Sequence, residues 1–225
     1  MNFHIVTIFP EVFEKYFQVG IMGRAQENKK IKVELYNLRD YSQNKHRKVD
    51  DTPYGGGPGM VMAVQPIVDC VMEIKKKIQE KNPKILKEEI KIVLLSAKGE
   101  KFNQKKAVQY KKFKHLILIC GRYEGVDERI IDFVADEEIS VGEYILSGGE
   151  LPAMTVVDVV SRLIPGVLGN EKSLESESYD SNGFQADFPV YTKPEKFGEW
   201  EVPKVLLSGN HGEIEKWREG KRESN

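Results

Sequence analysis

Two consecutive runs of sequence decide the fold: Leu116-Ile117-Leu118-Ile119-Cys120 and Gly121-Arg122-Tyr123-Glu124-Gly125-Val126-Asp127-Glu128-Arg129. The first run is entirely apolar, which is typical of a buried strand in a parallel sheet. The second run therefore lies at the carboxyl end of that strand, where open α/β sheets bind their ligands. It combines two glycines with cations, a phenol and carboxylates, and this combination predicts a ligand-binding turn. An ordinary strand-to-helix turn with a capping pair is the alternative.

Strands and helices alternate on both sides of this stretch. Further strands are expected at Phe3–Phe9, Ile31–Leu38 and Ile90–Leu95, and helices at Gln65–Glu80, Lys105–Lys112 and Pro152–Ile164. This alternation predicts an α/β fold with a mostly parallel sheet. The chain has 225 residues, of which 40% are apolar, and can bury a substantial core. No apolar run approaches the roughly 18 to 20 residues that span a bilayer, and no secretory signal is visible.

Charge is distributed unevenly along the chain. The formal net charge is −1, yet residues 75–114 hold 14 Lys against 4 Glu, whereas residues 124–187 hold 15 Asp or Glu against three basic residues. A local excess of cations attracts polyanions such as RNA even in a neutral chain; a solvated lysine-rich helix face is the alternative. Cys70 and Cys120 are expected to be reduced, as in a cytoplasmic protein. Cysteines and histidines do not cluster with metal-ligand spacing, so no metal site is predicted.

The character of the sequence changes after Gly169. Residues 170–188 are acidic and serine-rich, which predicts a linker or a loop. The chain is therefore expected to form an α/β domain at 1–168, a linker at 169–190 and a small C-terminal part at 191–225. The last part is too short to fold alone.

A second glycine-containing segment reads Ser140-Val141-Gly142-Glu143-Tyr144-Ile145-Leu146-Ser147-Gly148-Gly149-Glu150-Leu151-Pro152. Its composition suits neither a strand nor a helix. It favours a backbone cradle that binds a flat heterocycle, with Ile145 and Leu146 covering the face of the ligand. The segment contains neither Gly-x-Gly-x-x-Gly nor Gly-Lys-Ser/Thr, so Rossmann-type and P-loop nucleotide binding are disfavoured. A hairpin turn is the alternative.

Five motifs, in order along the chain, resemble the bacterial tRNA (guanine-37-N1)-methyltransferase family: Asp51–Met60, Gly121–Arg129, Gly142–Met154, Arg162–Gly169 and Val205–His211. The resemblance extends from about Asn2 to Trp217. It implies the SPOUT fold, in which part of an α/β sheet forms a C-terminal trefoil knot that binds S-adenosylmethionine. It also implies methyl transfer from this cofactor to N1 of guanine 37 in tRNA, with Mg²⁺ as an optional addition. Residues 169–190 would then hold an active-site loop, and residues 191–225 a shortened helical domain that binds tRNA.

The resemblance assigns roles to individual residues. The cofactor would be held around the two glycine segments, by Leu95, Ser96, Gly121, Tyr123, Gly125, Val141, Gly142, Glu143, Tyr144, Ile145, Leu146, Gly148 and Gly149. The tRNA would contact basic residues and an active-site loop, at Arg24, His46, Arg47, Asp50, Gly57 and Gly59. Glycine suits such sites because it lets the backbone approach a ligand closely.

Methylation of guanine N1 requires a general base, because this nitrogen carries a proton at neutral pH. The family pattern places a carboxylate after Gly169. Counting from Gly169 without a gap gives Glu177 as this carboxylate, whereas an alignment with a gap gives Asp180. The ungapped choice keeps the spacing to Arg162 and is preferred. By resemblance, Arg162 faces guanine O6, where negative charge builds up, and Glu124 orients the guanine.

Family members are homodimers with shared active sites, and the same arrangement is expected here. The expected partners are the anticodon stem-loop of tRNA and a second copy of the chain, but neither DNA nor a membrane. Two alternatives stay open: a non-catalytic RNA-binding protein on a SPOUT scaffold, and a SPOUT methyltransferase that acts on another RNA. The glycine cradle and Arg162 disfavour the first alternative, and the loop at residues 50–60 disfavours the second.

Overall fold

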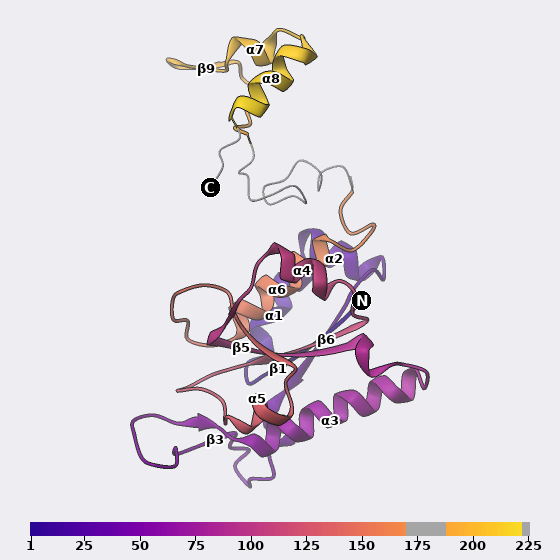
Figure 1. Ribbon diagram of the computed structural model, residues 1–225, viewed down its shortest axis with the longest axis vertical. Helices are drawn as coiled ribbons and strands as arrows, with labels where there is room; N and C mark the ends of the chain where they lie inside the picture. The colour runs from indigo at the N-terminus through magenta and orange to yellow at the C-terminus, as the bar shows by residue number, and fades with distance from the viewer. Residues whose placement is uncertain (170–187, 222–225) are drawn as a thin grey trace. The chain divides into compact units, whose positions relative to one another are not determined.

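The computed structural model describes residues 1–169 and 188–221 (Figure 1). The chain divides into two compact units, residues 1–169 and residues 170–225. Among the described residues, no helix combines the length and the apolar character needed to cross a membrane. The expected division into a cofactor domain, a linker and a tRNA-binding part stays a prediction.

A five-stranded sheet organises the first unit. Its strands lie in the order β2-β1-β6-β5-β7, and every neighbouring pair is parallel. The strands are β1 (Asn2–Thr7), β2 (Lys32–Asn37), β5 (Ile90–Lys101), β6 (His115–Cys120) and β7 (Glu137–Ser140). The predicted α/β fold with a mostly parallel sheet is confirmed, and the trefoil knot stays a prediction. Because all five strands run in the same direction, the sheet has one amino edge and one carboxyl edge.

Helices cover both faces of this sheet, as Figure 1 shows. One face carries α1 (Glu11–Gln18), α2 (Gly20–Glu27), α4 (Gln104–Tyr110) and α6 (Glu150–Arg162). The other face carries the 3-10 turn η1 (Leu38–Tyr41), α3 (Val64–Lys81) and α5 (Arg129–Phe133). Smaller elements complete the unit: β3 (Asp50–Asp51), which pairs with β4 (Val61–Met62), and the turn η2 (Lys87–Glu89).

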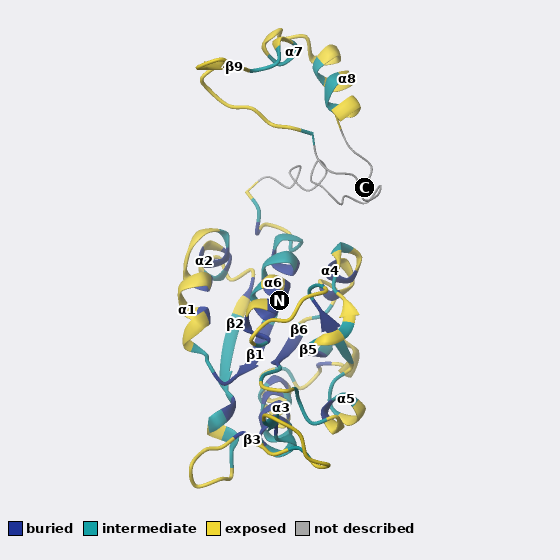
Figure 2. Cartoon of the chain, turned by 90° about the vertical axis from the view of Figure 1, so that its left-hand side faces the viewer, coloured by how far each residue is buried: buried dark blue, intermediate teal, exposed yellow. Residues whose placement is uncertain are grey.

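The central strand, β6, is buried from both sides of the sheet, as Figure 2 shows. Each of the residues from Leu116 to Cys120 in β6 is at most 1% exposed. Burying one such side chain stabilises the fold by about 1.5 to 3 kcal/mol. A polar residue in β6 would meet apolar side chains on either face, which explains the unbroken apolar run.

Strands β5 and β7 differ from what the sequence predicts. The predicted strand ends at Leu95, whereas β5 continues to Lys101, and its pairing with β7 shifts register between Leu95 and Glu100. The sequence did not predict β7, because Glu137 gives this strand a polar start. The Glu137 carboxylate is paired instead with the Lys106 ammonium at 2.7 Å. Charged residues are tolerated there because β7 is an edge strand.

The second unit is built from short elements. They are β8 (Lys196–Phe197), β9 (Trp200–Glu201), α7 (Lys204–Leu207) and α8 (His211–Lys221), with the two strands paired antiparallel. None of residues 188–221 is buried. The expectation that the C-terminal part is too small to fold alone stays a prediction.

Two histidines meet at the amino edge of the sheet. The distance between Nε2 of His4 and Nδ1 of His115 is 3.0 Å, and Nδ1 of His4 lies 3.2 Å from Oε2 of Glu34. Burial lowers the pKa of His4 to about 4, although the Glu34 carboxylate opposes this shift. Burial likewise lowers the pKa of His115. Both imidazoles are therefore neutral at pH 7.

We expect the protein to lose stability as the pH falls from about 6.5 towards 4, because of His4. In this range the unfolded chain takes up a proton at His4 and the folded chain does not, so the free energy of unfolding decreases. The decrease reaches on the order of 3 kcal/mol at the acid end. Urea unfolding across this range checks the prediction: His4→Gln should flatten the pH dependence, and His46→Gln, at an exposed position, should not. An unchanged pH dependence in His4→Gln would contradict it.

Candidate active site

A cavity of about 540 Å³ lies at the carboxyl edge of the sheet. Three segments line it: residues 94–98 of β5, residues 121–128 after β6, and most of residues 138–149, which end β7 and lead to α6. Loops from neighbouring parallel strands meet at this edge, which is where open α/β sheets bind ligands. The volume lies within the range of ligand pockets, roughly 300 to 1,000 Å³.

The cavity brings together most of the residues that the sequence assigned to the cofactor. Eleven of the thirteen line it: Leu95, Ser96, Gly121, Tyr123, Gly125, Val141, Tyr144, Ile145, Leu146, Gly148 and Gly149. The other two, Gly142 and Glu143, lie in the same loop but do not line the cavity. Gly142 packs against the ring of Tyr144, and the exposed Glu143 carboxylate pairs with Lys101 at 2.5 Å.

Two glycines hold the walls of the cavity close together. The amide of Gly149 donates a hydrogen bond of 2.8 Å to the carbonyl of Gly121. A Cβ atom on Gly149 would lie 2.6 Å from the Cα of Cys120, and one on Gly121 would lie 2.8 Å from the carbonyl oxygen of Leu95. These neighbours are backbone atoms and cannot turn away, so glycine is required at both positions.

A buried carboxylate joins the two glycine segments. Glu150 is 3% exposed; its Oε1 accepts a hydrogen bond from the Thr7 hydroxyl at 2.8 Å, and its Oε2 accepts one from Nε of Arg122 at 3.0 Å. The Arg122 guanidinium lies 4.7 Å from the centre of the Phe9 ring. No role was predicted for Arg122 or Glu150 from the sequence. The sequence does contain a signal for the burial of Glu150, because this residue is a single acid at the start of an apolar helix.

We expect Glu150→Gln to lower the free energy of unfolding by about 3 kcal/mol, because it leaves the partly buried Arg122 guanidinium without a charged partner. The matched control is Glu73→Gln, which breaks the exposed ion pair with Lys77 and should cost less than about 1 kcal/mol. Urea unfolding of both variants measures the difference. Equal losses in the two variants would show that the buried pair does not hold the segments together.

The segment from Asp50 to Met62 is attached to one wall of the cavity. The amide of Glu124 donates to the carbonyl of Met60 at 3.0 Å, and the amide of Met62 donates to the carbonyl of Gly125 at 2.9 Å. Burial and the Asp50 carboxylate raise the pKa of the Tyr123 hydroxyl, and Arg39 opposes this shift. Two residues predicted to contact tRNA thus lie at this wall: Asp50 acts on Tyr123, and Gly59 touches the predicted catalytic Glu124.

The remaining predicted residues do not line the cavity. Arg162 is the last residue of α6, whereas the cavity-lining Pro152 lies near the start of that helix. Arg24 is exposed on α2, and the exposed loop residues His46, Arg47 and Gly57 lie outside the cavity lining. Both predicted bases, Glu177 and Asp180, lie outside the described residues.

The chemistry of the cavity fits S-adenosylmethionine, which is a sulfonium cation. The Oε1 atom of Glu138, which lines the cavity, is buried and has no hydrogen-bond partner among the described residues. Glu124 adds a second carboxylate, and carboxylates favour a positively charged ligand. The side chain of Ile145 is 83% exposed and offers apolar contact for a flat ring. In the described part of the chain, no group of three or more His, Cys, Asp or Glu residues is arranged to hold a metal ion.

Known proteins resemble the chain over nearly its whole length. Residues 1–225 match the family described as "tRNA (Guanine-1)-methyltransferase TrmD". The chain is 50% identical over 218 residues to the tRNA (guanine-N(1)-)-methyltransferase of Clostridioides difficile (strain 630), covering 97% of this chain and 90% of that protein. It is 46% identical over 225 residues to the protein of the same name from Finegoldia magna (strain ATCC 29328 / DSM 20472 / WAL 2508), covering 100% of this chain and 91% of that one. The chain therefore belongs to the tRNA (guanine-1)-methyltransferase family.

Proposed function

We propose that this protein transfers the methyl group of S-adenosylmethionine to N1 of guanine 37 in the anticodon loop of tRNA. Membership of the tRNA (guanine-1)-methyltransferase family gives the reaction class, and that class implies the use of S-adenosylmethionine. One observation carries the assignment to this site: the glycine-lined cavity at the carboxyl edge is formed by the motif residues that resemble the family.

Different residues of the cavity bind different parts of S-adenosylmethionine. Backbone groups around Leu95, Gly121 and Gly149 hold the adenine, and Ile145 and Leu146 cover it. The carboxylates of Glu124 and Glu138 attract the positive charge of the ligand. When bound, S-adenosylmethionine supplies an activated methyl group on a sulfonium.

The guanine is made reactive by the side chains of the protein. We assign removal of the N1 proton to the carboxylate of Glu177, with Asp180 as the alternative. Arg162 stabilises the negative charge that develops on guanine O6. Glu124, on the cavity wall, orients the purine, so that N1 points at the methyl group. Alignment of this kind supplies much of the remaining rate enhancement.

The position of Arg162 supports a homodimer with shared active sites. Helix α6 starts beside the cavity and has 13 residues, which makes it about 20 Å long. The residues that follow Arg162, namely Leu163, Ile164 and Pro165, line a different hollow at the amino edge. Arg162 therefore acts on a guanine bound at the cavity of a second copy of the chain, as expected for a twofold dimer.

Mixed dimers test the shared active site. Gly149→Ala weakens cofactor binding and Arg162→Ala removes the cation, so each homodimer should have almost no activity at a cofactor concentration near the wild-type Kd. A heterodimer of the two variants keeps one site with an intact cavity and an intact arginine. Co-expression with two different affinity tags should restore about a quarter of the wild-type activity in an equal mixture. If no activity returns, Arg162 acts within its own subunit.

A methyl-transfer assay tests the function against its two alternatives. Purified protein should transfer labelled methyl groups from S-adenosylmethionine to an unmodified tRNA transcript, but not to a transcript in which adenine replaces guanine 37. A non-catalytic RNA-binding protein would bind tRNA without labelling it. A methyltransferase for another RNA would label ribosomal RNA in preference. The same assay with a chelator tests the use of Mg²⁺, and competition with duplex DNA tests whether DNA binds.

The cytoplasm is the proposed location, since tRNA and S-adenosylmethionine are both present there.

A further inference from the structure

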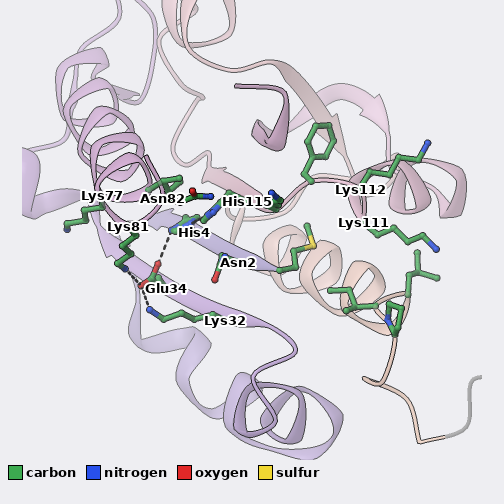
Figure 3. Close-up of a pocket in the computed structure, with 17 residues that line it drawn as sticks. Asn2, His4, Lys32, Glu34, Lys77, Lys81, Asn82, Lys111, Lys112 and His115 are labelled. Atoms are coloured by element: carbon green, nitrogen blue, oxygen red, sulfur yellow. Dashed lines mark hydrogen bonds and ion pairs between the residues drawn. The ribbon is translucent and has the colours of Figure 1, made fainter. Parts of the chain in front are cut away.

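Cations line the cavity at the carboxyl edge and also a hollow of about 860 Å³ at the amino edge of the sheet (Figure 3). In the hollow, four lysines pair with carboxylates of the protein itself: Lys32, Lys77, Lys81 and Lys114. Figure 3 shows Lys111 and Lys112 pointing away from the hollow. The cations at the amino edge are therefore neutralised by the protein or directed elsewhere.

The charges that line the carboxyl-edge cavity are balanced differently. Among the residues that the structure describes, the cations in its lining are Lys98 and Arg122, and the acids are Glu124, Asp127, Glu128 and Glu138. Nζ of Lys98 lies 2.8 Å from Oε2 of Glu128, so these two charges neutralise each other. Arg122 is the second cation, and its partner, Glu150, lies outside the lining.

The guanidinium of Arg122 is held from two sides. Its Nε donates to Oε2 of Glu150 at 3.0 Å, and the centre of the Phe9 ring lies 4.7 Å away. The Thr7 hydroxyl in turn donates to the other oxygen of Glu150. The backbones of Arg122 and Gly148 form an antiparallel bridge, and a Cβ on Gly148 would lie 2.2 Å from Nε of Arg122. The guanidinium therefore lies directly against the glycine loop that lines the cavity.

The two terminal nitrogens of this guanidinium make no hydrogen bond to any residue in the described part of the chain. Arginine has five N–H donors in a planar fork, and here only the Nε–H is used. The side chain is 24% exposed and contributes to the cavity lining. A fork that is fixed on one side and open on the other is preorganised to bind a carboxylate through two parallel hydrogen bonds.

S-adenosylmethionine carries a carboxylate in addition to its sulfonium. Its amino-acid end holds an α-ammonium and an α-carboxylate. Glu124 and Glu138 attract the ammonium and the sulfonium, but they repel the carboxylate. A guanidinium with unused donors beside the α-carboxylate removes this repulsion, and Arg122 is a lining residue with such donors.

We propose that Arg122 binds the α-carboxylate of S-adenosylmethionine and so selects methyl donors that keep this group. The assignment rests on the proposed function. Nη1 and Nη2 of Arg122 donate two charge-assisted hydrogen bonds to the carboxylate, while Nε remains with Glu150. The amino-acid arm of the donor is thereby fixed, which helps to align the methyl group with guanine N1.

Calorimetry with two ligands tests this assignment: S-adenosylmethionine and decarboxylated S-adenosylmethionine, which lacks only the carboxylate. The Kd of the decarboxylated ligand divided by that of S-adenosylmethionine isolates the contact, because a general change in the cavity affects both ligands alike. Arg122→Gln should lower this ratio about tenfold or more, the usual contribution of hydrogen bonds between charged groups. The matched control is Lys98→Gln, which removes the other lining cation and should change the ratio less than about twofold.

A second variant separates the contact from the stability of the fold. Arg122→Gln leaves the buried Glu150 carboxylate without its partner, which destabilises the protein. Arg122→Gln/Glu150→Gln removes both charges and should lower the ratio to the same extent. The assignment is overturned if the ratio in these variants equals the wild-type ratio, or if Lys98→Gln lowers it as much. Wild-type protein that binds neither ligand would overturn the proposed function, and this assignment with it.

Discussion

Replacing Gly149 with alanine will weaken the binding of S-adenosylmethionine about a hundredfold. The added Cβ would lie 2.6 Å from the Cα of Cys120 and 2.9 Å from the amide nitrogen of Gly121. Because both neighbours are backbone atoms, the two loops that line the cavity must move apart and lose the hydrogen bond between Gly149 and Gly121. Overpacking of this kind costs roughly 1 to 3 kcal/mol, and a hundredfold change in Kd corresponds to about 2.7 kcal/mol.

Two further glycine variants make this test specific. Gly148→Ala places its Cβ against Nε of Arg122 and Oε2 of Glu150, the two atoms of the buried ion pair, so it should weaken binding as well. Gly220→Ala, in α8, meets nothing within 4 Å and should change nothing. Calorimetry gives the affinities, and thermal unfolding shows that each variant is folded. Wild-type affinity in a folded Gly149→Ala protein would place the cofactor elsewhere.

Replacing Glu177 with glutamine will lower the rate of methyl transfer by a factor of about 10² to 10⁴, the usual contribution of a general base. The amide cannot accept the N1 proton of guanine, whereas its size preserves the surroundings. Binding of S-adenosylmethionine should not change, because the proposed role of this carboxylate is to remove a proton from guanine and not to bind the cofactor. Single-turnover kinetics with saturating cofactor measure the loss.

Asp180→Asn is the matched variant for this prediction. If Glu177 is the base, Asp180→Asn keeps nearly full activity, and the opposite pattern assigns the role to Asp180. The variant that lacks the base should also lose the acid limb of the pH–rate profile, since that limb reports protonation of the carboxylate. Full activity in both variants would show that neither residue removes the proton.

Short-range patterns predicted the sheet and much of the candidate site. The run from Leu116 to Cys120 identified a central strand because only a strand covered on both faces is apolar throughout. The glycines at 121 and 149 marked places where backbone approaches backbone. The first segment follows the predicted central strand, so its place at the carboxyl edge could be expected. The second segment follows β7, a strand that the sequence did not predict.

Contacts between distant parts of the chain were not predictable in this way. Glu150 is buried because Thr7 and Arg122 supply its hydrogen bonds, and the three lie far apart in the sequence. Similarly, Lys32, Lys81 and Lys114 look like ordinary surface lysines until the fold gathers them around one hollow. The separation of Arg162 from the cavity depends on the direction of α6, which local sequence does not specify.

Mass spectrometry of a tRNA transcript, after incubation with the protein and S-adenosylmethionine, shows which nucleotide and which atom are methylated. The transcript is digested to nucleotides, and the position and chemical identity of the methylated base are determined. We expect a single added methyl group at guanine 37, present as N1-methylguanosine and much reduced when the Gly149→Ala protein is used at the same low cofactor concentration. A methyl group on another atom or nucleotide, or equal product from the Gly149→Ala protein, would contradict it.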